Sequence, residues 1–226
     1  TFFWDKHGMA SKRFNYAQGV EPSQVLSEML MPRSIDVLKL YGVDYDFPPE
    51  SRVKPAMRAD INASLSRGTS MYYYVGHGAE DNLSDEQVFQ SSDIANLGNG
   101  MKRPLFVAFS CDVGVFDSPG TLSMAEKFIL GVDGGAIGSI CASQVSFVGP
   151  NNGLSSAFFT NLFPGRNVTT TVSVAAALQL AKVAYTQNKA NSQRYNFFGD
   201  PGMRLPHPPD DLGFASASVD TLKTGA

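Results

Sequence analysis

The sequence MYYYVGHG occupies residues 71–78 and joins an aromatic, strand-like run to a histidine that lies between two glycines. Aromatic and β-branched residues in a run of this length predict a β-strand over 71–75. A second run, residues 104–110, is almost continuously apolar, as expected for a strand buried on both faces, and it ends at Cys111. His77 and Cys111 therefore each follow a predicted strand, 34 residues apart.

The rest of the chain alternates strand-like runs with amphipathic helical patterns, and residues 79–103 are largely polar and loop-like. Such alternation predicts an α/β fold with a mostly parallel central sheet and helices on both faces. The predicted strands are 1–4, 35–41, 71–75, 104–110 and 135–141. The predicted helices are 25–30, 55–67, 92–97, 122–130, 154–163 and 174–185.

Parallel strands would bring His77 and Cys111 to the same edge of this sheet. Ligands of open α/β sheets bind beyond the carboxyl ends of the strands, so chemistry is expected at that edge. A cysteine peptidase needs a nucleophilic sulfur, a base that later protonates the leaving amine, and donors for the oxyanion. Cys111 and His77 supply the first two, and the N–H groups of Gly78 and Cys111 are candidate donors.

Each residue also has an ordinary structural explanation when it is taken alone. A cysteine at the end of a buried strand is usually a small hydrophobic residue, and a histidine between glycines can serve a turn. The paired placement of Cys111 and His77 favours a catalytic site over both explanations. Cys141 lies inside an apolar run and is predicted to belong to the core, although a disulfide with Cys111 is conceivable in an oxidising compartment.

Composition argues against several other classes of protein. The net charge is −3, and no Lys/Arg run is longer than a dipeptide, so neither nucleic acid nor an anionic membrane is expected as a partner. The longest apolar runs fall far short of the roughly 20 residues that span a bilayer. The three histidines, His7, His77 and His207, show no spacing typical of a metal site, so a metal hydrolase is set aside.

The two runs and several later segments resemble the gingipain family, a branch of the caspase-like cysteine peptidases that includes clostripain and separase. The segments 72–78 and 106–111 resemble its histidine and nucleophile strands. The other matching segments are Phe116-Asp117, Met124-Ala125-Glu126, Gly134 to Gly138 and Asn196 to Pro201. The resemblance implies a caspase-like three-layer sandwich, a Cys–His dyad and hydrolysis of peptide bonds through an acyl-enzyme.

The resemblance also implies an acidic residue that follows an early strand and orients the histidine. Asp5 is the best positional match, with an ordinary strand-end turn residue as the alternative reading, and Asp112 is a less suitable candidate because it adjoins Cys111. No organic cofactor or catalytic metal is expected. Members of the family can bind structural calcium, but no Asp/Asn-rich loop with ligand spacing is present.

Specificity is expected to differ from that of family members that cleave after Arg or Lys, which place a carboxylate in the primary pocket. Val75 and residues 143–148, which would line that pocket, include no Asp or Glu. Phe147 is a candidate apolar wall, and the acidic residues at 80–81 and 85–86 are the alternative source of charge. An uncharged side chain before the scissile bond is therefore favoured.

Both ends of the sequence look cut, so further domains of the same polypeptide are expected. We predict a catalytic domain over residues 1–206, followed by a linker and the start of another module over 207–226. The favoured function is a cysteine endopeptidase acting on protein or peptide substrates, secreted or displayed by a bacterium as the resemblance implies. The alternatives are a gingipain-like sortase or transpeptidase, a catalytically inactive caspase-fold binding domain and, more distantly, an intracellular caspase-like domain activated by a partner.

Overall fold

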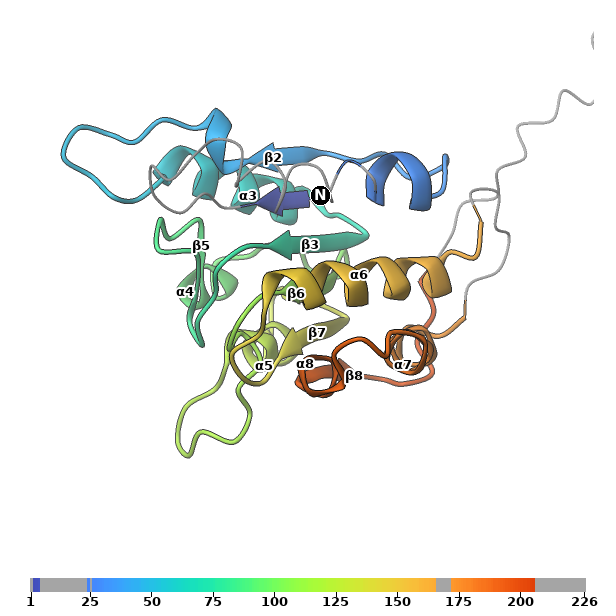
Figure 1. The fold of residues 1–226 in the computed structure, drawn as a ribbon. Helices are drawn as coiled ribbons and strands as arrows, with labels where there is room; N and C mark the ends of the chain where they lie inside the picture. Colours follow the sequence, from blue (N-terminus) through green and yellow to red (C-terminus); the bar gives the residue numbers. More distant parts are fainter. Residues whose placement is uncertain (1, 5–23, 25, 166–171, 206–226) are drawn as a thin grey trace, which may run out of the picture.

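A six-stranded sheet with helices on both faces forms the body of the protein (Figure 1). The computed structural model describes residues 2–4, 24, 26–165 and 172–205. The sheet strands are β1 (Phe2–Trp4), β2 (Lys39–Tyr41), β3 (Met71–Val75), β6 (Leu105–Phe109), β7 (Gly138–Ala142) and β8 (Tyr195–Gly199). The α-helices are α3 (Pro55–Arg67), α4 (Ser91–Ile94), α5 (Met124–Leu130), α6 (Val148–Leu162), α7 (Val174–Ala184) and α8 (Lys189–Gln193).

The strand order is β2-β1-β3-β6-β7-β8, and every neighbouring pair is parallel except the last, β7 with β8. β3 and β6 are the two central strands, and all ten of their residues are buried. This burial on both faces explains why each strand reads as a continuous apolar run. The predicted α/β class with a mostly parallel sheet is therefore confirmed.

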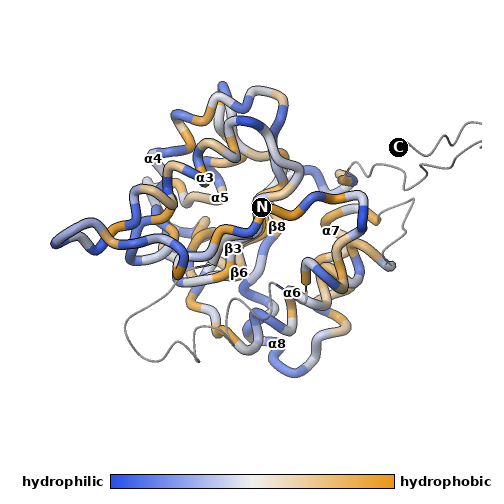
Figure 2. Tube along the Cα trace, turned by 90° about the horizontal axis from the view of Figure 1, so that it is seen from above, coloured by the Kyte–Doolittle hydropathy of each residue, from blue (hydrophilic) through white to orange (hydrophobic). Residues whose placement is uncertain are grey.

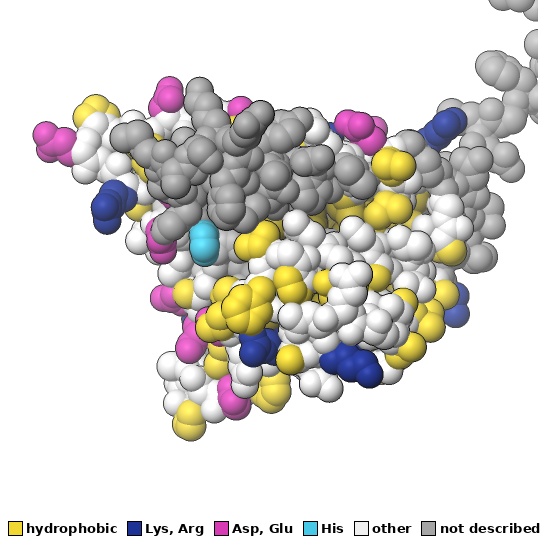
Figure 3. Space-filling view, viewed as in Figure 1, with side chains coloured by type: hydrophobic (Ala, Val, Ile, Leu, Met, Phe, Trp, Pro, Cys, Tyr) yellow, Lys and Arg dark blue, Asp and Glu magenta, His cyan; other side chains and the backbone are white. Residues whose placement is uncertain are grey.

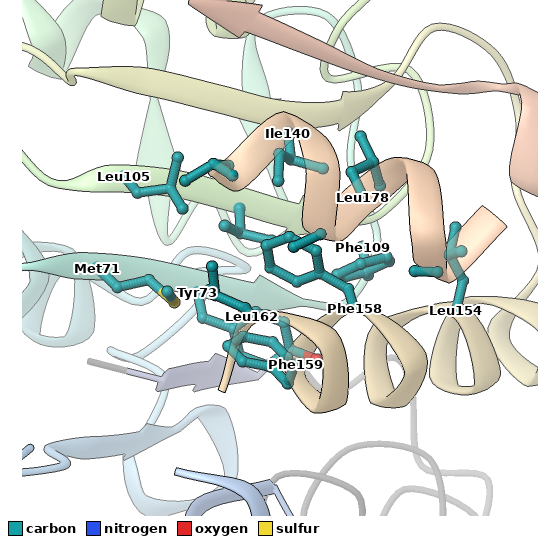
Figure 4. Close-up of a cluster of buried hydrophobic side chains, with 14 of the residues drawn as sticks. Met71, Tyr73, Leu105, Phe109, Ile140, Leu154, Phe158, Phe159, Leu162 and Leu178 are labelled. Carbon is teal, nitrogen blue, oxygen red and sulfur yellow. The ribbon is translucent and has the colours of Figure 1, made fainter. Parts of the chain in front are cut away.

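Two hydrophobic clusters occupy opposite faces of the sheet, because successive strand residues point to opposite sides. Odd-numbered residues of β3 and β6 pack against α6 and α7, where Tyr73 meets Phe159 edge to face (Figure 4). Even-numbered residues pack against α3, α4 and α5, where Phe106 lies 4.5 Å from Phe128 between ring centroids. Figure 2 shows the two helix groups on either side of the strands. The three-layer sandwich is confirmed by this arrangement.

The predicted helices at 55–67 and 174–185 form as α3 and α7, while other elements differ in extent. The segment 35–41 contributes only three strand residues, and Leu26–Leu30 forms a short π-helix. α6 begins at Val148, six residues before the predicted start. Its first turns contain Gly149, Pro150 and Gly153, which read as helix breakers, although proline is tolerated in a first turn.

The polar segment 79–103 is not simply a loop. It contains a small antiparallel hairpin, β4 (Asn82–Leu83) and β5 (Phe89–Gln90), followed by α4. Leu83 and Phe89 are fully buried, so the hairpin anchors the chain that leaves β3. No helix in the described part of the chain is long and apolar enough to cross a membrane.

Candidate active site

The sheet register sets His77 and Cys111 at equivalent places beyond two neighbouring strands. Val75, the last residue of β3, pairs with Phe109, the last residue of β6. His77 and Cys111 each follow two residues later. The Ser110 hydroxyl donates a hydrogen bond of 2.8 Å to the Gly76 carbonyl. The segments that follow the two strands are therefore joined one residue before His77 and Cys111.

The backbone of His77 is fixed from two directions while its side chain is exposed. Its carbonyl oxygen accepts hydrogen bonds from the Tyr74 hydroxyl at 2.7 Å and from the Ser84 N–H at 2.8 Å. The second bond belongs to a short antiparallel bridge between Gly78 and Leu83. Figure 3 shows the single described histidine at the surface, close to exposed hydrophobic side chains. The imidazole is thus accessible to a substrate.

Gly78 lies so close to residues 110–113 that a side chain would not fit. A Cβ atom built there would stand 2.4 Å from the Ser110 Oγ, 2.7 Å from Val113 Cγ2 and 2.8 Å from the Cys111 carbonyl oxygen. The position after His77 therefore has room only for a residue without a side chain. Within the described residues, no backbone acceptor is assigned to the N–H groups of Gly78 or Cys111.

The Cys111 thiol is half-buried and forms hydrogen bonds with three atoms of Ser146. The sulfur accepts from the Ser146 backbone N–H at 3.3 Å, and the Ser146 hydroxyl lies 3.9 Å from it. The thiol in turn donates to the Ser146 carbonyl oxygen at 3.2 Å. Ser146 belongs to the segment that connects β7 to α6, so the neighbouring parallel strand also delivers its following loop to the sulfur.

A buried polar network holds Ser146 in place. Its hydroxyl accepts hydrogen bonds from Asn151 Nδ2 at 2.9 Å and from the Tyr195 hydroxyl at 3.1 Å. Asn191 donates to Asn151 and accepts from the Phe147 N–H, each at 2.9 Å. Sequence reasoning missed this network, because its members come from α6, α8 and β8 and form no motif. The only available signal was the density of Ser and Asn beside the apolar strand 138–142.

Asp112 has a left-handed backbone conformation, with φ of 56°. Asp tolerates this region better than most residues, and here it turns the chain directly after Cys111. Burial raises the pKa of the Asp112 carboxyl, and the positive charge of Arg194 partly opposes that rise. The charged group that acts on Asp112 is thus Arg194, on the β8 side of the site.

The segment that would line a primary pocket carries exposed apolar side chains. Val145 and Phe147 have 55% and 54% of their surface exposed, which leaves both free to contact a substrate. The Arg194 guanidinium lies over the Phe147 ring at 5.5 Å and also donates to the Val145 carbonyl. The loop next to Cys111 therefore presents apolar surface and one cation.

Other predicted residues take structural positions. Cys141 is fully buried in β7, where burial raises the pKa of its thiol, and both cysteines are free. Glu86, from the acidic cluster, is buried and bonded to the Ser84 hydroxyl, whereas Glu80 and Asp85 are exposed. The described residues include no group of three or more His, Cys, Asp or Glu that could hold a metal ion.

Asp5 lies outside the described residues. The last described residue before it, Trp4, ends β1 and pairs with Val75 of β3. The chain therefore reaches Asp5 from the strand that neighbours the histidine strand.

Comparisons with known proteins agree with the fold. The model of peptidase family C25 matches residues 5–206. The crystal structure of the Arg-specific cysteine proteinase gingipain R superimposes with a TM-score of 0.66 at 16% identity, covering 90% of this chain and 46% of that one. The complex of the pro- and mature domains of RgpB from Porphyromonas gingivalis gives 0.66 at 15% identity, covering 90% and 47%.

No curated protein matches the chain in sequence. At identities of 15–16% the structural likeness shows the fold. This chain spans about half the length of those solved relatives.

Proposed function

This chain belongs to peptidase family C25, and from that premise we propose that it is a cysteine peptidase whose nucleophile is Cys111 and whose base is His77. The observation that carries the proposal is the register of β3 and β6, which sets the two residues at equivalent positions beyond paired strand ends. One edge of the sheet thereby carries a partly exposed thiol and an exposed imidazole.

In the proposed reaction, the His77 imidazole takes the proton from the Cys111 thiol, and the sulfur attacks the carbonyl carbon of a peptide bond. The C–N bond of the tetrahedral intermediate then breaks as His77 returns the proton to the leaving amine. Water hydrolyses the resulting thioester and regenerates the thiol. The exposed position of the imidazole supports this role, because the base must reach both the sulfur and the leaving group.

The oxyanion would be held by the backbone N–H groups of Gly78 and Cys111. Neither amide is assigned a backbone acceptor within the described residues, so both can turn to a substrate oxygen. The close fit of Gly78 against Cys111 supports the assignment, since it brings the two amides into one region. Removing one donor of this kind typically slows catalysis by about 10²–10³-fold in other enzymes.

We propose that the carboxylate of Asp5 orients the imidazole of His77. A carboxylate in this role holds an imidazole in its productive tautomer and stabilises the imidazolium that forms. The pairing of Trp4 with Val75 supports Asp5, because the preceding strand adjoins the histidine strand. Asp112 is the less suitable candidate because it adjoins Cys111 in the sequence.

The proposed substrate is a protein or peptide with an uncharged side chain before the scissile bond. Phe147 and Val145 offer exposed apolar surface next to Ser146, and the Arg194 guanidinium contacts both residues. A cation at this point would repel an Arg or Lys side chain. The preference would thus differ from that of the Arg-specific gingipain R.

Secretion or display at a bacterial cell surface is proposed from family membership. We also propose that residues 1–206 form the catalytic domain, because the family match ends at residue 206. The complex of the RgpB pro- and mature domains supports the proposal that further domains accompany this one.

The experiment that tests the proposal is labelling of the purified chain with an irreversible thiol-reactive peptide, followed by mapping of the modified residue. Cys111→Ala and His77→Ala are labelled alongside, and Cys141→Ala serves as the matched cysteine control. We expect fast labelling confined to Cys111, much slower in His77→Ala and unchanged in Cys141→Ala. A thiolate held beside an imidazole reacts far faster than an ordinary buried cysteine.

The proposal fails if Cys111 in the intact chain reacts no faster than a free thiol, or if its rate does not depend on His77. The inactive binding domain would then become the better description. When labelling is fast, product analysis with and without an added amine nucleophile separates hydrolysis from transpeptidation.

A further inference from the structure

We propose that Ser146 is a further residue of the reactive site, one that stabilises the sulfur of Cys111 as a thiolate through its backbone N–H and its side-chain hydroxyl. The inference rests on the proposed function, in which Cys111 is the nucleophile. It concerns the reacting atom itself, because both donor groups of Ser146 contact the sulfur at 3.3 and 3.9 Å.

The direction of the Ser146 hydroxyl follows from its other partners. A serine hydroxyl has one hydrogen to donate and two lone pairs to accept with. Asn151 Nδ2 and the Tyr195 hydroxyl both donate to this oxygen, at 2.9 and 3.1 Å, and so occupy its two lone pairs. The hydroxyl hydrogen is left to donate, and the acceptor within its reach is the Cys111 sulfur.

This arrangement is fixed before any substrate binds. Ser146, Asn151, Asn191 and Tyr195 each have less than a tenth of their surface exposed. Asn191 bonds both to the Asn151 side chain and to the Phe147 N–H, so the chain is held at two points directly after Ser146. Buried networks in which every member is satisfied are rigid, so the two donors keep their aim at the sulfur.

The backbone carbonyl of Ser146 binds the neutral thiol of Cys111 in the resting state. The neutral thiol donates its hydrogen to this oxygen at 3.2 Å. When His77 takes that proton, the bond to the carbonyl is lost, while the N–H and O–H donors strengthen because they now face a negative charge. Ser146 thereby shifts the balance of the Cys111–His77 pair toward the thiolate and imidazolium forms.

The test is the pH dependence of Cys111 alkylation by iodoacetamide in the full chain, compared with Ser146→Ala. We expect the variant to react about three- to tenfold more slowly near neutral pH, with the midpoint of its pH–rate profile moved upward. Ser146→Thr, which retains the hydroxyl, should restore much of the rate. Ser146→Val has nearly the same shape as Ser146→Thr but lacks the hydroxyl, so it should not restore the rate. The comparison of the threonine and valine variants remains informative if Ser146→Ala does not fold.

Ser155→Ala is the matched control. Ser155 is also buried and also bonded to a buried tyrosine, with 2.7 Å between its hydroxyl and that of Tyr73. Ser155→Ala also removes a serine hydroxyl that is hydrogen-bonded to a buried tyrosine, but on the part of α6 that packs against β3. We expect a loss of stability similar to that of Ser146→Ala with an unshifted alkylation profile.

An unshifted profile in Ser146→Ala, with fast and His77-dependent alkylation in the unaltered chain, would overturn the inference and leave the proposed function intact. An equal shift in Ser155→Ala would overturn it as well, because the effect would then be one of general packing. If Cys111 is inert in the unaltered chain, the proposed function fails first and this inference fails with it.

Discussion

Gly78 and Cys111 approach so closely that a methyl group on the glycine would stand 2.8 Å from the Cys111 carbonyl oxygen. The segment that contains His77 and the segment that contains Cys111 are thus in close contact at the edge of the sheet. The contact explains why a residue without a side chain follows His77, and it makes Gly78 a sensitive point for both geometry and reaction.

Gly78→Ala is expected to lower kcat/KM by about 10²-fold or more, because the added methyl would push the Gly78 N–H away from the oxyanion. Stability should fall as well, by about 1–3 kcal/mol, which is the usual cost of overpacking. Peptide hydrolysis and urea unfolding measure the two effects. Gly98→Ala is the matched control, because a Cβ at Gly98 meets no atom within 4 Å.

Ser110→Ala tests the bond that joins the two strand ends. The Ser110 hydroxyl is buried and donates to the Gly76 carbonyl, so its loss should cost about 1 kcal/mol of unfolding free energy and reduce the alkylation rate of Cys111. Ser139→Ala removes a similar buried bond, from Ser139 to the Ala125 carbonyl, on β7. We expect it to lose similar stability with an unchanged alkylation rate. Equal slowing in both variants would contradict a specific role for Ser110.

The central strands and their following residues could be predicted from sequence because burial on both faces leaves a continuous apolar run. Residues 71–75 and 105–109 are such strands, and the parallel arrangement then requires His77 and Cys111 to share an edge. The same logic identified Cys141 as a core residue. These features depend on local composition, which a single sequence displays directly.

The features that were missed depend on contacts between distant segments. The hairpin of β4 and β5 has strands of only two residues, too short for an alternating pattern to emerge. The contact between Ser146 and Cys111 spans 35 positions, and the support from Tyr195 spans 49. Small polar residues of this kind are common in loops, so only the fold shows which of them meet the sulfur.

Asp112→Asn is predicted to change how stability depends on pH. Burial raises the pKa of Asp112 in the folded protein. The contribution of this carboxyl to the unfolding free energy is therefore fully present below its ordinary pKa of 3.8, and it is lost as pH rises through the raised pKa. An amide does not ionise, so the variant should match the unaltered protein at low pH and become relatively more stable above that window. Unfolding free energies at a series of pH values measure the difference.

Asp112→Val separates this charge effect from the backbone. The left-handed φ of 56° suits Asn about as well as Asp, whereas a β-branched residue is strained there by about 1–2 kcal/mol. The valine variant should therefore be less stable than Asp112→Asn at every pH. A stability difference between Asp112→Asn and the unaltered protein that stays constant with pH would show that this carboxyl does not titrate as proposed.

Substrate preference is the direct test of the proposed difference between this chain and the Arg-specific gingipain R. Peptides that vary only before the scissile bond should be cleaved with kcat/KM about tenfold or more higher for an unbranched apolar side chain than for Arg or Lys. Two features support this order: the apolar surface of Phe147 and Val145, and the cation of Arg194 over that surface.

Arg194→Met keeps the length of the side chain and removes its charge, so the discrimination against Arg and Lys should narrow. Phe147→Ala should lower the rate for the apolar peptide more than for a glycine peptide, because it removes the wall and leaves the charge. A preference for Arg that persists in both variants would place the primary pocket elsewhere and direct attention to the exposed carboxylates of Glu80 and Asp85.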